Sequence, residues 1–229
     1  MIKIISFKIC PCYQKISALL EAIGLPYESE FLDLNNIPQW FLDISPEIEP
    51  AIQTNLGDHI SGLHTIIQYL ENQFQPLFCN MDTRYKENNE RWLDLAIEQY
   101  INQCNTQRSS DLESMLERGI PFFDGLERME KRIGSSKFFL GDKLSMVDIV
   151  WIPVLHRAQI VKDRTDYDYL AKYPKLKQWQ KHLMQTGIPE RSVPEDFIDV
   201  FDNFYLNKET HYLNRIKKPC LLNMIKMSI

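Results

Sequence analysis

The chain has 229 residues, of which 44% are apolar, and a formal net charge of −5. This length suits one or two compact domains, and the apolar share is ample for a buried core. Acidic and basic residues are interspersed along the chain, so no basic face predicts a nucleic-acid partner and no block of like charge predicts a disordered tail.

Apolar runs and cysteines indicate the compartment. No run reaches the roughly 18 apolar residues that a membrane-spanning helix needs, and the run after Lys3 is too short for a signal peptide. The five cysteines are odd in number and irregularly spaced, which indicates reduced thiols rather than a disulfide framework. We therefore expect a cytoplasmic protein. Cys10 and Cys12 have no second close Cys or His pair to complete four zinc ligands, so no metal site is predicted.

The first third of the chain alternates short apolar runs with helical stretches, which is the pattern of an α/β unit. The expected elements are a strand over 2–8, a helix over 11–23, a strand over 27–32, a short helix near 38–43, a hairpin that pairs 51–53 with 59–60, and a helix from 63 to about 72. This order is typical of a thioredoxin-like domain, which we assign to residues 1–75. In such a domain the first helix presents its N-terminus to a surface cleft.

The remainder of the chain has apolar residues at spacings of three and four, as in Trp92, Leu95 and Ala96, which predicts helices throughout. The expected helices cover about 84–106, 109–133, 146–161 and 174–185, after a linker over 74–83, and form an all-helical domain over 84–207. Ser145 and Asp148 fit a capping box, in which Ser145 caps the third of these helices and Asp148 reaches back.

The tripeptide Cys10-Pro11-Cys12 lies at the first turn from strand to helix. A cysteine there faces the unpaired N–H groups of the first helical turn, which favour the thiolate over the thiol. Pro11 suits the first helical position, where its missing N–H is not needed and its fixed φ fits the turn. Cys10 is therefore a candidate nucleophile. The alternative is a buried and inert cysteine, since reactivity requires an electropositive and partly exposed site.

A thioredoxin-like half joined to an all-helical half with a capping box resembles the glutathione transferases, and the details resemble the omega class. The resemblance covers about residues 1–207. Its segments are Ile9-Cys10-Pro11, Pro38-Gln39-Trp40-Phe41, Glu49-Pro50, Pro76-Leu77, Phe139-Leu140-Gly141-Asp142, Tyr173-Pro174 through Trp179, and Asp196-Phe197 through Tyr205-Leu206. Glu49-Pro50 matches a Val-Pro whose proline is cis in the family.

The resemblance implies a chemistry for Cys10. In the omega class a cysteine forms a mixed disulfide with glutathione and supports thiol transfer and dehydroascorbate reduction, and Cys10 occupies that position. The resemblance also implies glutathione as the ligand, a small thiol or an electrophilic compound as the other substrate, and a homodimer.

The expected glutathione-binding positions depart from the family pattern. The backbone at Glu49-Pro50 would position the cysteinyl part, but the Glu49 carboxylate adds a negative charge beside an anionic ligand. The Glu-Ser pair that holds the γ-glutamyl end corresponds to Gly62 and Leu63, neither of which can make those side-chain hydrogen bonds. Ile37 stands where a lysine is expected. Each lost charged hydrogen bond is worth about 1.5–3 kcal/mol, so we expect weak glutathione binding.

Three further side chains near this site have open roles. Cys12 either acts as a resolving thiol, through a strained and easily reduced disulfide, or packs as a small apolar side chain. Tyr13 either donates to the Cys10 sulfur or simply packs. Ser61 either replaces the missing serine or caps the helix that follows it.

Four side chains lie on helices that border the cleft in the family fold: Trp92, Tyr100, Trp151 and His156. They either line a pocket for the acceptor substrate or pack in the core, which is the default for residues at helical spacing. His64 and His156 both have apolar neighbours along their helices, so we expect both in the core or at an interface rather than as bases.

Two functions compete. The first is a glutathione-transferase-like thiol transferase or oxidoreductase with Cys10 as nucleophile and weak or altered glutathione binding, which the retained Cys10-Pro11 favours. The second is a non-catalytic binding or regulatory protein on the same fold, comparable in kind to the stringent starvation proteins. The altered pocket favours this alternative.

Residues 208–229 extend beyond the resemblance and combine basic with apolar side chains. Docking on the molecule's own surface, contact with a second subunit and attachment to an anionic membrane are the three alternatives. We expect the first, because the remaining surface is acidic and Pro219 would interrupt a long helix lying on a membrane.

Overall fold

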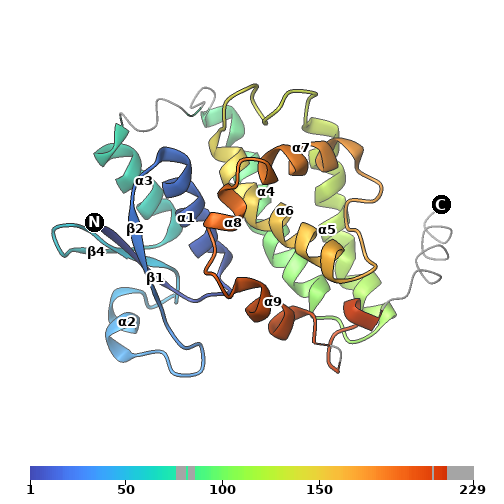
Figure 1. Cartoon of the computed structure of the whole chain (residues 1–229), viewed down its shortest axis with the longest axis horizontal. Coiled ribbons are helices and arrows are strands. Elements are labelled where there is room, and N and C mark those ends of the chain that lie inside the picture. Colours follow the sequence, from blue (N-terminus) through green and yellow to red (C-terminus); the bar gives the residue numbers. More distant parts are fainter. Residues whose placement is uncertain (76–80, 82–85, 208, 216–229) are drawn as a thin grey trace.

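The computed structural model describes residues 1–75, 81, 86–207 and 209–215 (Figure 1). A small sheet with its helices forms one end of the molecule, and a bundle of longer helices forms the other. Most of the linker expected over 74–83 and most of the extension over 208–229 lie outside the described residues.

The sheet has four strands in the order β2-β1-β3-β4: β1 Ile2–Ser6, β2 Tyr27–Phe31, β3 Ala51–Gln53 and β4 His59–Ser61. Strand β1 runs parallel to β2 and antiparallel to β3, so Ile4 lies opposite both Ser29 and Ile52. Alternate side chains of β1 enter different cores, because successive residues of a strand point to opposite faces. Ile4 packs in the main core, whereas Ile5 packs in a smaller cluster.

Helices cover the two faces of this sheet. Helices α1 (Pro11–Ile23) and α3 (Leu63–Gln73) contribute to the main core with Ile4. Helix α2 (Gln39–Ile44) supplies Phe41 to the smaller cluster with Ile5. The expected thioredoxin-like arrangement is therefore confirmed.

The other half of the described chain is helical. Its helices are α4 Lys86–Gln107, α5 Leu112–Arg132, α6 Met146–Arg164, α7 Pro174–Met184, α8 Ile188–Arg191, α9 Phe197–Tyr205 and the 3₁₀ turn η2 Leu213–Arg215. Helix α6 is buried along most of its length and packs against α4 on one side and α1 on another. The expected α/β plus all-α fold class is confirmed. Helix α6 joins the two halves, because it contacts α1 of the first half and α4 of its own half.

The backbone before Pro50 differs from the sequence-based expectation. The described residues contain no cis peptide bond, so the expected cis proline at Pro50 is wrong. The chain turns instead at Ile48, whose φ of 57° is left-handed and whose N–H donates to the Ser45 carbonyl at 3.0 Å. The Ser45 hydroxyl then donates to the Glu49 carbonyl at 2.9 Å and fixes the following residue.

Within the described part of the chain, no helix is both long and apolar enough to cross a membrane.

Candidate active site around Cys10

Cys10 is the N-cap residue of α1. Its backbone is extended (φ −71°, ψ 126°), Pro11 follows at the first helical position, and the Tyr13 N–H donates to the Cys10 sulfur at 3.5 Å. The expected local geometry is therefore present. An N-cap residue with its acceptor atom over the first turn satisfies one of the helix's free N–H groups, and here the acceptor is a half-buried sulfur.

Cys12 lies in the same helical turn, and both cysteines are free thiols. The Cys12 thiol donates a hydrogen bond to the Cys10 sulfur, which is the largest cause that lowers the pKa of Cys10 to about 6. Burial opposes this shift and the Tyr13 N–H adds to it. The pKa of Cys12 is raised in turn, first by its bond to Cys10 and then by burial. The pair therefore holds one thiolate on Cys10 and one proton on Cys12.

A buried lysine lies three residues after Cys12 on the same helix. Lys15 is only 1% exposed, and its Nζ has no hydrogen-bond partner among the described residues. Burial lowers the pKa of Lys15, whereas the charges of Cys12 and Cys10 act in the opposite direction. An ammonium group enclosed in this way stabilises a thiolate beside it more strongly than it would in water.

A second buried cation supports the turn from the helical half. Arg157 of α6 donates through Nη2 to the Ile9 carbonyl at 3.2 Å and through Nη1 to Gln14 Oε1 at 2.5 Å. Its guanidinium lies over the rings of Phe197 and Tyr100, at 5.2 and 5.7 Å from their centres. Arg157 therefore fixes the residue that precedes Cys10 from a helix of the other half.

The same interface contains a neutral histidine. Burial lowers the pKa of His156 to about 3, so its ring is neutral, and the Gln14 side-chain amide donates to Nδ1 at 2.8 Å. Gln14 also donates to the Pro189 carbonyl at 3.3 Å, while the Ser17 hydroxyl donates to the Ser192 carbonyl at 2.6 Å. These bonds join α1 to α6 and to the α8 segment.

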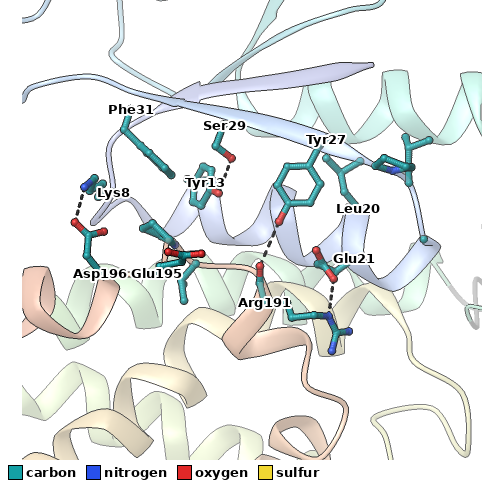
Figure 2. Close-up of a pocket in the computed structure, with 15 residues that line it drawn as sticks. Lys8, Tyr13, Leu20, Glu21, Tyr27, Ser29, Phe31, Arg191, Glu195 and Asp196 are labelled. Carbon is teal, nitrogen blue, oxygen red and sulfur yellow. Dashed lines mark hydrogen bonds and ion pairs between the residues drawn. The ribbon is translucent and has the colours of Figure 1, made fainter.

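The Tyr13 side chain points away from Cys10. Its hydroxyl lies 2.8 Å from the Ser29 hydroxyl, and its ring packs against Phe31 with the centres 5.0 Å apart (Figure 2). Tyr13 thus contributes its backbone N–H to Cys10, and donation from its side chain, one of the two expected alternatives, does not occur.

Figure 2 shows the cavity beside Tyr13, between β2, α1 and the segment after α8. Its volume is about 890 Å³, and the ion pairs Lys8–Asp196 and Glu21–Arg191 lie along it. Cys10 does not line this cavity, so the cavity and the thiol pair are separate features of the molecule.

The expected glutathione-binding residues meet at the start of α3. Gly62 is the N-cap of α3 with φ 86°, and its N–H donates to the Pro50 carbonyl at 3.2 Å. A Cβ at position 62 would lie 3.1 Å from Glu49 Oε2, so the Glu49 carboxylate covers the place where the family has a glutamate side chain. Leu63 is buried, and Ser61 belongs to β4, so Ser61 is not the cap.

The four residues considered for an acceptor pocket divide into two groups. The Trp151 indole N–H donates to the Trp92 carbonyl at 3.0 Å, and the Trp151 ring packs against Trp179. Trp92 and Trp151 therefore lie in the helical core. Tyr100 and His156 lie nearer the Cys10 turn, beside Arg157 and Gln14.

His64 is exposed on α3, so it does not lie in the core of this chain and its expected place at an interface stays a prediction, whereas His156 is buried as expected. Among the residues that the structure describes, no group of three or more His, Cys, Asp or Glu side chains could hold a metal ion.

Comparison with known proteins identifies the family. The family model "Glutathione S-transferase, N-terminal domain" matches residues 9–73, and "Glutathione S-transferase, C-terminal domain" matches residues 116–181. The chain belongs to the glutathione transferase superfamily. It is 24% identical over 196 residues to mouse glutathione S-transferase omega-1, which covers 82% of this chain and 78% of the relative. It is 27% identical over 206 residues to glutathione S-transferase L3 of Arabidopsis thaliana, with 86% and 85% covered.

Solved structures agree on the fold of this glutathione transferase. Glutathione transferase Omega 3C from Trametes versicolor superposes with a TM-score of 0.70 at 23% identity, over 85% of this chain and 89% of that one. A rice glutathione transferase solved with glutathione gives a TM-score of 0.72 at 19% identity, over 88% and 98%. The omega resemblance is therefore supported by relatives in sequence, and the solved structures support the fold.

Sequence reasoning missed the buried polar residues of the interface, namely Gln14, Lys15 and Arg157. A signal for the first two was present, because Gln14 and Lys15 interrupt an otherwise apolar stretch of α1 directly after the cysteines. Arg157 had no such local signal, since its partners Ile9 and Gln14 lie far from it in the chain.

Proposed function

We propose that this chain is a cysteine-type thiol transferase of the glutathione transferase superfamily, with Cys10 as the nucleophile. The Cys10 thiolate attacks a sulfur of a disulfide or an electrophilic carbon, and the mixed disulfide or thioether forms on Cys10. Dehydroascorbate reduction belongs to the same range of chemistry. A homodimer with glutathione as the thiol ligand completes the proposal.

The observation that carries this proposal is the position of Cys10 at the N-cap of α1, with a pKa of about 6. Most of this thiol is ionised at neutral pH, and the thiolate is the reactive form of cysteine. The similarity to omega-class relatives supports the assignment, because the omega class uses a cysteine for this chemistry and Cys10 is the residue of this chain that resembles it.

Weak glutathione binding is part of the proposal. Gly62 and Leu63 offer no side-chain hydrogen bonds to a γ-glutamyl group, and Ile37 packs against the smaller core cluster instead of presenting a charge. Glu49 is the one anionic group that covers Gly62 among the described residues, so it is the group available to a ligand's ammonium there. Its carboxylate would attract the α-ammonium and repel the glycyl carboxylate if that end approached.

The test is transfer of a glutathionyl group from a peptide mixed disulfide, followed with and without Cys10→Ser, together with calorimetric titration of glutathione. We expect Cys10→Ser to abolish transfer while the melting temperature stays within a few degrees. For the unaltered protein we expect a dissociation constant nearer millimolar than micromolar. Transfer that persists in Cys10→Ser would remove Cys10 from the mechanism, and micromolar affinity would contradict the altered pocket.

The altered pocket also favours a second candidate, a non-catalytic binding protein on this fold. Restoring a glutamate at position 62 would not recover the pocket, because Gly62 has a left-handed φ of 86° and a Cβ there would meet the Glu49 carboxylate. This alternative predicts that the chain transfers no thiol group from small disulfides and that it forms a stable complex with a protein partner.

A further inference from the structure

Cys12 is placed to take part in the chemistry of Cys10. Cys10 is the N-cap of α1 and Cys12 lies in its first turn, and both are half-buried free thiols. Residues two apart at a helix start have Cα atoms within the ~4.4–6.8 Å that a disulfide spans. The Cα separation therefore permits closure of a Cys10–Cys12 disulfide, although side chains two apart on a helix do not face each other and the bond is strained.

Lys15 gives independent support, because its Nζ is enclosed and has no hydrogen-bond partner among the described residues. A buried cation without a partner is unfavourable unless an anion is available nearby. The charges that act on the Lys15 pKa are those of Cys12 and Cys10, at the start of its own helix, and that of Arg157 from α6. Of these groups only the two cysteines can become anionic, and Cys12 lies three residues before Lys15 on the same helix face, so Lys15 is placed to stabilise a thiolate on Cys12.

We infer that Cys12 is a second catalytic thiol, which resolves the mixed disulfide on Cys10; this inference rests on the proposed function. Lys15 is a positioning residue in the same step, because it stabilises the thiolate on the sulfur that carries it. The reaction starts when the Cys10 thiolate attacks a disulfide R–S–S–R. One S–S bond breaks, Cys10–S–S–R forms, and the first thiol leaves after taking a proton from solvent.

The second step moves the negative charge. Once Cys10 is in a disulfide, it no longer accepts the Cys12 proton and no longer repels a Cys12 thiolate. The two effects of Cys10 that raise the pKa of Cys12 therefore disappear. The attraction of Lys15 remains, opposed by burial and by Glu49. Cys12 loses its proton to solvent and attacks the Cys10 sulfur, which breaks the Cys10–SR bond and releases the second thiol as RSH.

The balance is one disulfide R–S–S–R reduced to two RSH, while the two cysteine thiols are oxidised to one Cys10–Cys12 disulfide. Two equivalents of a small thiol, or one dithiol, reduce that disulfide and restore the protein. A disulfide closed within one helical turn is strained, and strained disulfides are reduced easily. This property suits a bond that forms and breaks in each cycle.

The test uses 2-hydroxyethyl disulfide as the probe, on the full chain, with intact mass and fragment-ion spectra as readouts. We expect the unaltered protein to pass through an adduct on Cys10 and to end lighter by two hydrogen atoms, with two thiols released. Cys12→Ser, and Cys12→Ala as a second variant, are expected to stop at a stable adduct on Cys10 with one thiol released. Cys104→Ser is the control, because Cys104 is buried and bonded to the Tyr205 hydroxyl.

The role of Lys15 has its own readout. Lys15→Met is expected to leave adduct formation on Cys10 possible but to slow closure of the disulfide at least tenfold at neutral pH, with the closure rate recovering at higher pH. Identical pH profiles for Lys15→Met and the unaltered protein would overturn the positioning role. A stable adduct on the unaltered protein would overturn the role of Cys12, whereas the absence of any adduct on Cys10 in the Cys12→Ser and Cys12→Ala variants would instead refute the proposed function.

Discussion

The reactivity of Cys10 depends on hydrogen-bond donors that are contributed by its own helix. The Cys12 thiol and the Tyr13 N–H both donate to the Cys10 sulfur, and together they outweigh the opposing effect of burial. Because these donors are fixed by the first turn of α1, Cys10 has its low pKa without any bound ligand.

We predict that iodoacetamide alkylates Cys10 with a rate that is half-maximal near pH 6, since the rate follows the thiolate fraction. Cys12→Ala removes the strongest donor and should move the midpoint toward the ordinary thiol range. Cys12→Ser keeps an O–H donor and should move it less. Sites are read by mass spectrometry, with buried Cys104 as the internal control. A midpoint of about 8.5 for unaltered Cys10 would contradict the prediction.

Residue roles could be predicted from the sequence where they depend on local geometry. Cys10 and Pro11 were correctly placed at the helix start, because a strand, a cysteine and a proline in that order leave few backbone choices. The burial of Lys15 and Arg157 could not be predicted, since it results from the packing of α1 against α6. The direction of the Tyr13 side chain likewise depends on Ser29 in the neighbouring strand.

The start of α6 is fixed by a reciprocal cap. Ser145 and Asp148 form the expected capping box, and the Asp148 carboxylate also accepts from the Phe139 N–H at 2.9 Å and from the Trp179 indole at 2.7 Å. Asp148 therefore joins α6 to α7 and to the loop before α6. Since α6 also carries Arg157 and His156, this cap fixes the position of the residues that support Cys10.

We predict that Asp148→Ala lowers the free energy of unfolding by about 3 kcal/mol or more, because it leaves several buried donors without an acceptor. Ser145→Ala removes a single cap and should cost about 1 kcal/mol. Urea unfolding of the two variants measures the difference. Equal losses would show that the bonds to Phe139 and Trp179 contribute nothing beyond the cap itself.

Element boundaries were predictable where the sequence contains its own start and stop signals. Helix α1 runs from Pro11 to Ile23 as expected, because proline begins it and Gly24, with φ 70°, ends it. Helices α8 and α9 were not predicted, since short helices are stabilised by tertiary contacts rather than by their own periodicity. The turn at Ile48, just before Pro50, was not indicated by any local motif.

The two halves of the molecule meet through α1, α6 and α8, and this interface lies directly behind Cys10. It combines apolar packing with buried polar groups that must remain in defined protonation states. His156 is 5% exposed, stacks on Phe197 with the ring centres 6.0 Å apart, and accepts from Gln14 only while its Nδ1 is unprotonated. Protonation of this ring would break a bond between the halves and add a charge beside Arg157.

We predict that the free energy of unfolding falls as the pH is lowered through the range of an unfolded histidine, near 6.5. In the folded protein burial lowers the pKa of His156 to about 3, so only the unfolded chain takes up this proton between those values. Unfolded protein is then favoured by up to about 1.4 kcal/mol for each pH unit. The contribution is fully present above pH 6.5 and is lost as the pH falls toward 3.

The measurement is urea unfolding at several pH values from about 7 to 5, above the range in which most carboxyl groups titrate. His156→Gln removes the titrating group, so its stability, although lower at pH 7, should depend less steeply on pH than that of the unaltered protein. His64→Gln is the matched control, because His64 is exposed on α3 and should leave the slope unchanged. A slope that is the same in all three proteins would show that the interface behind Cys10 does not depend on a neutral His156.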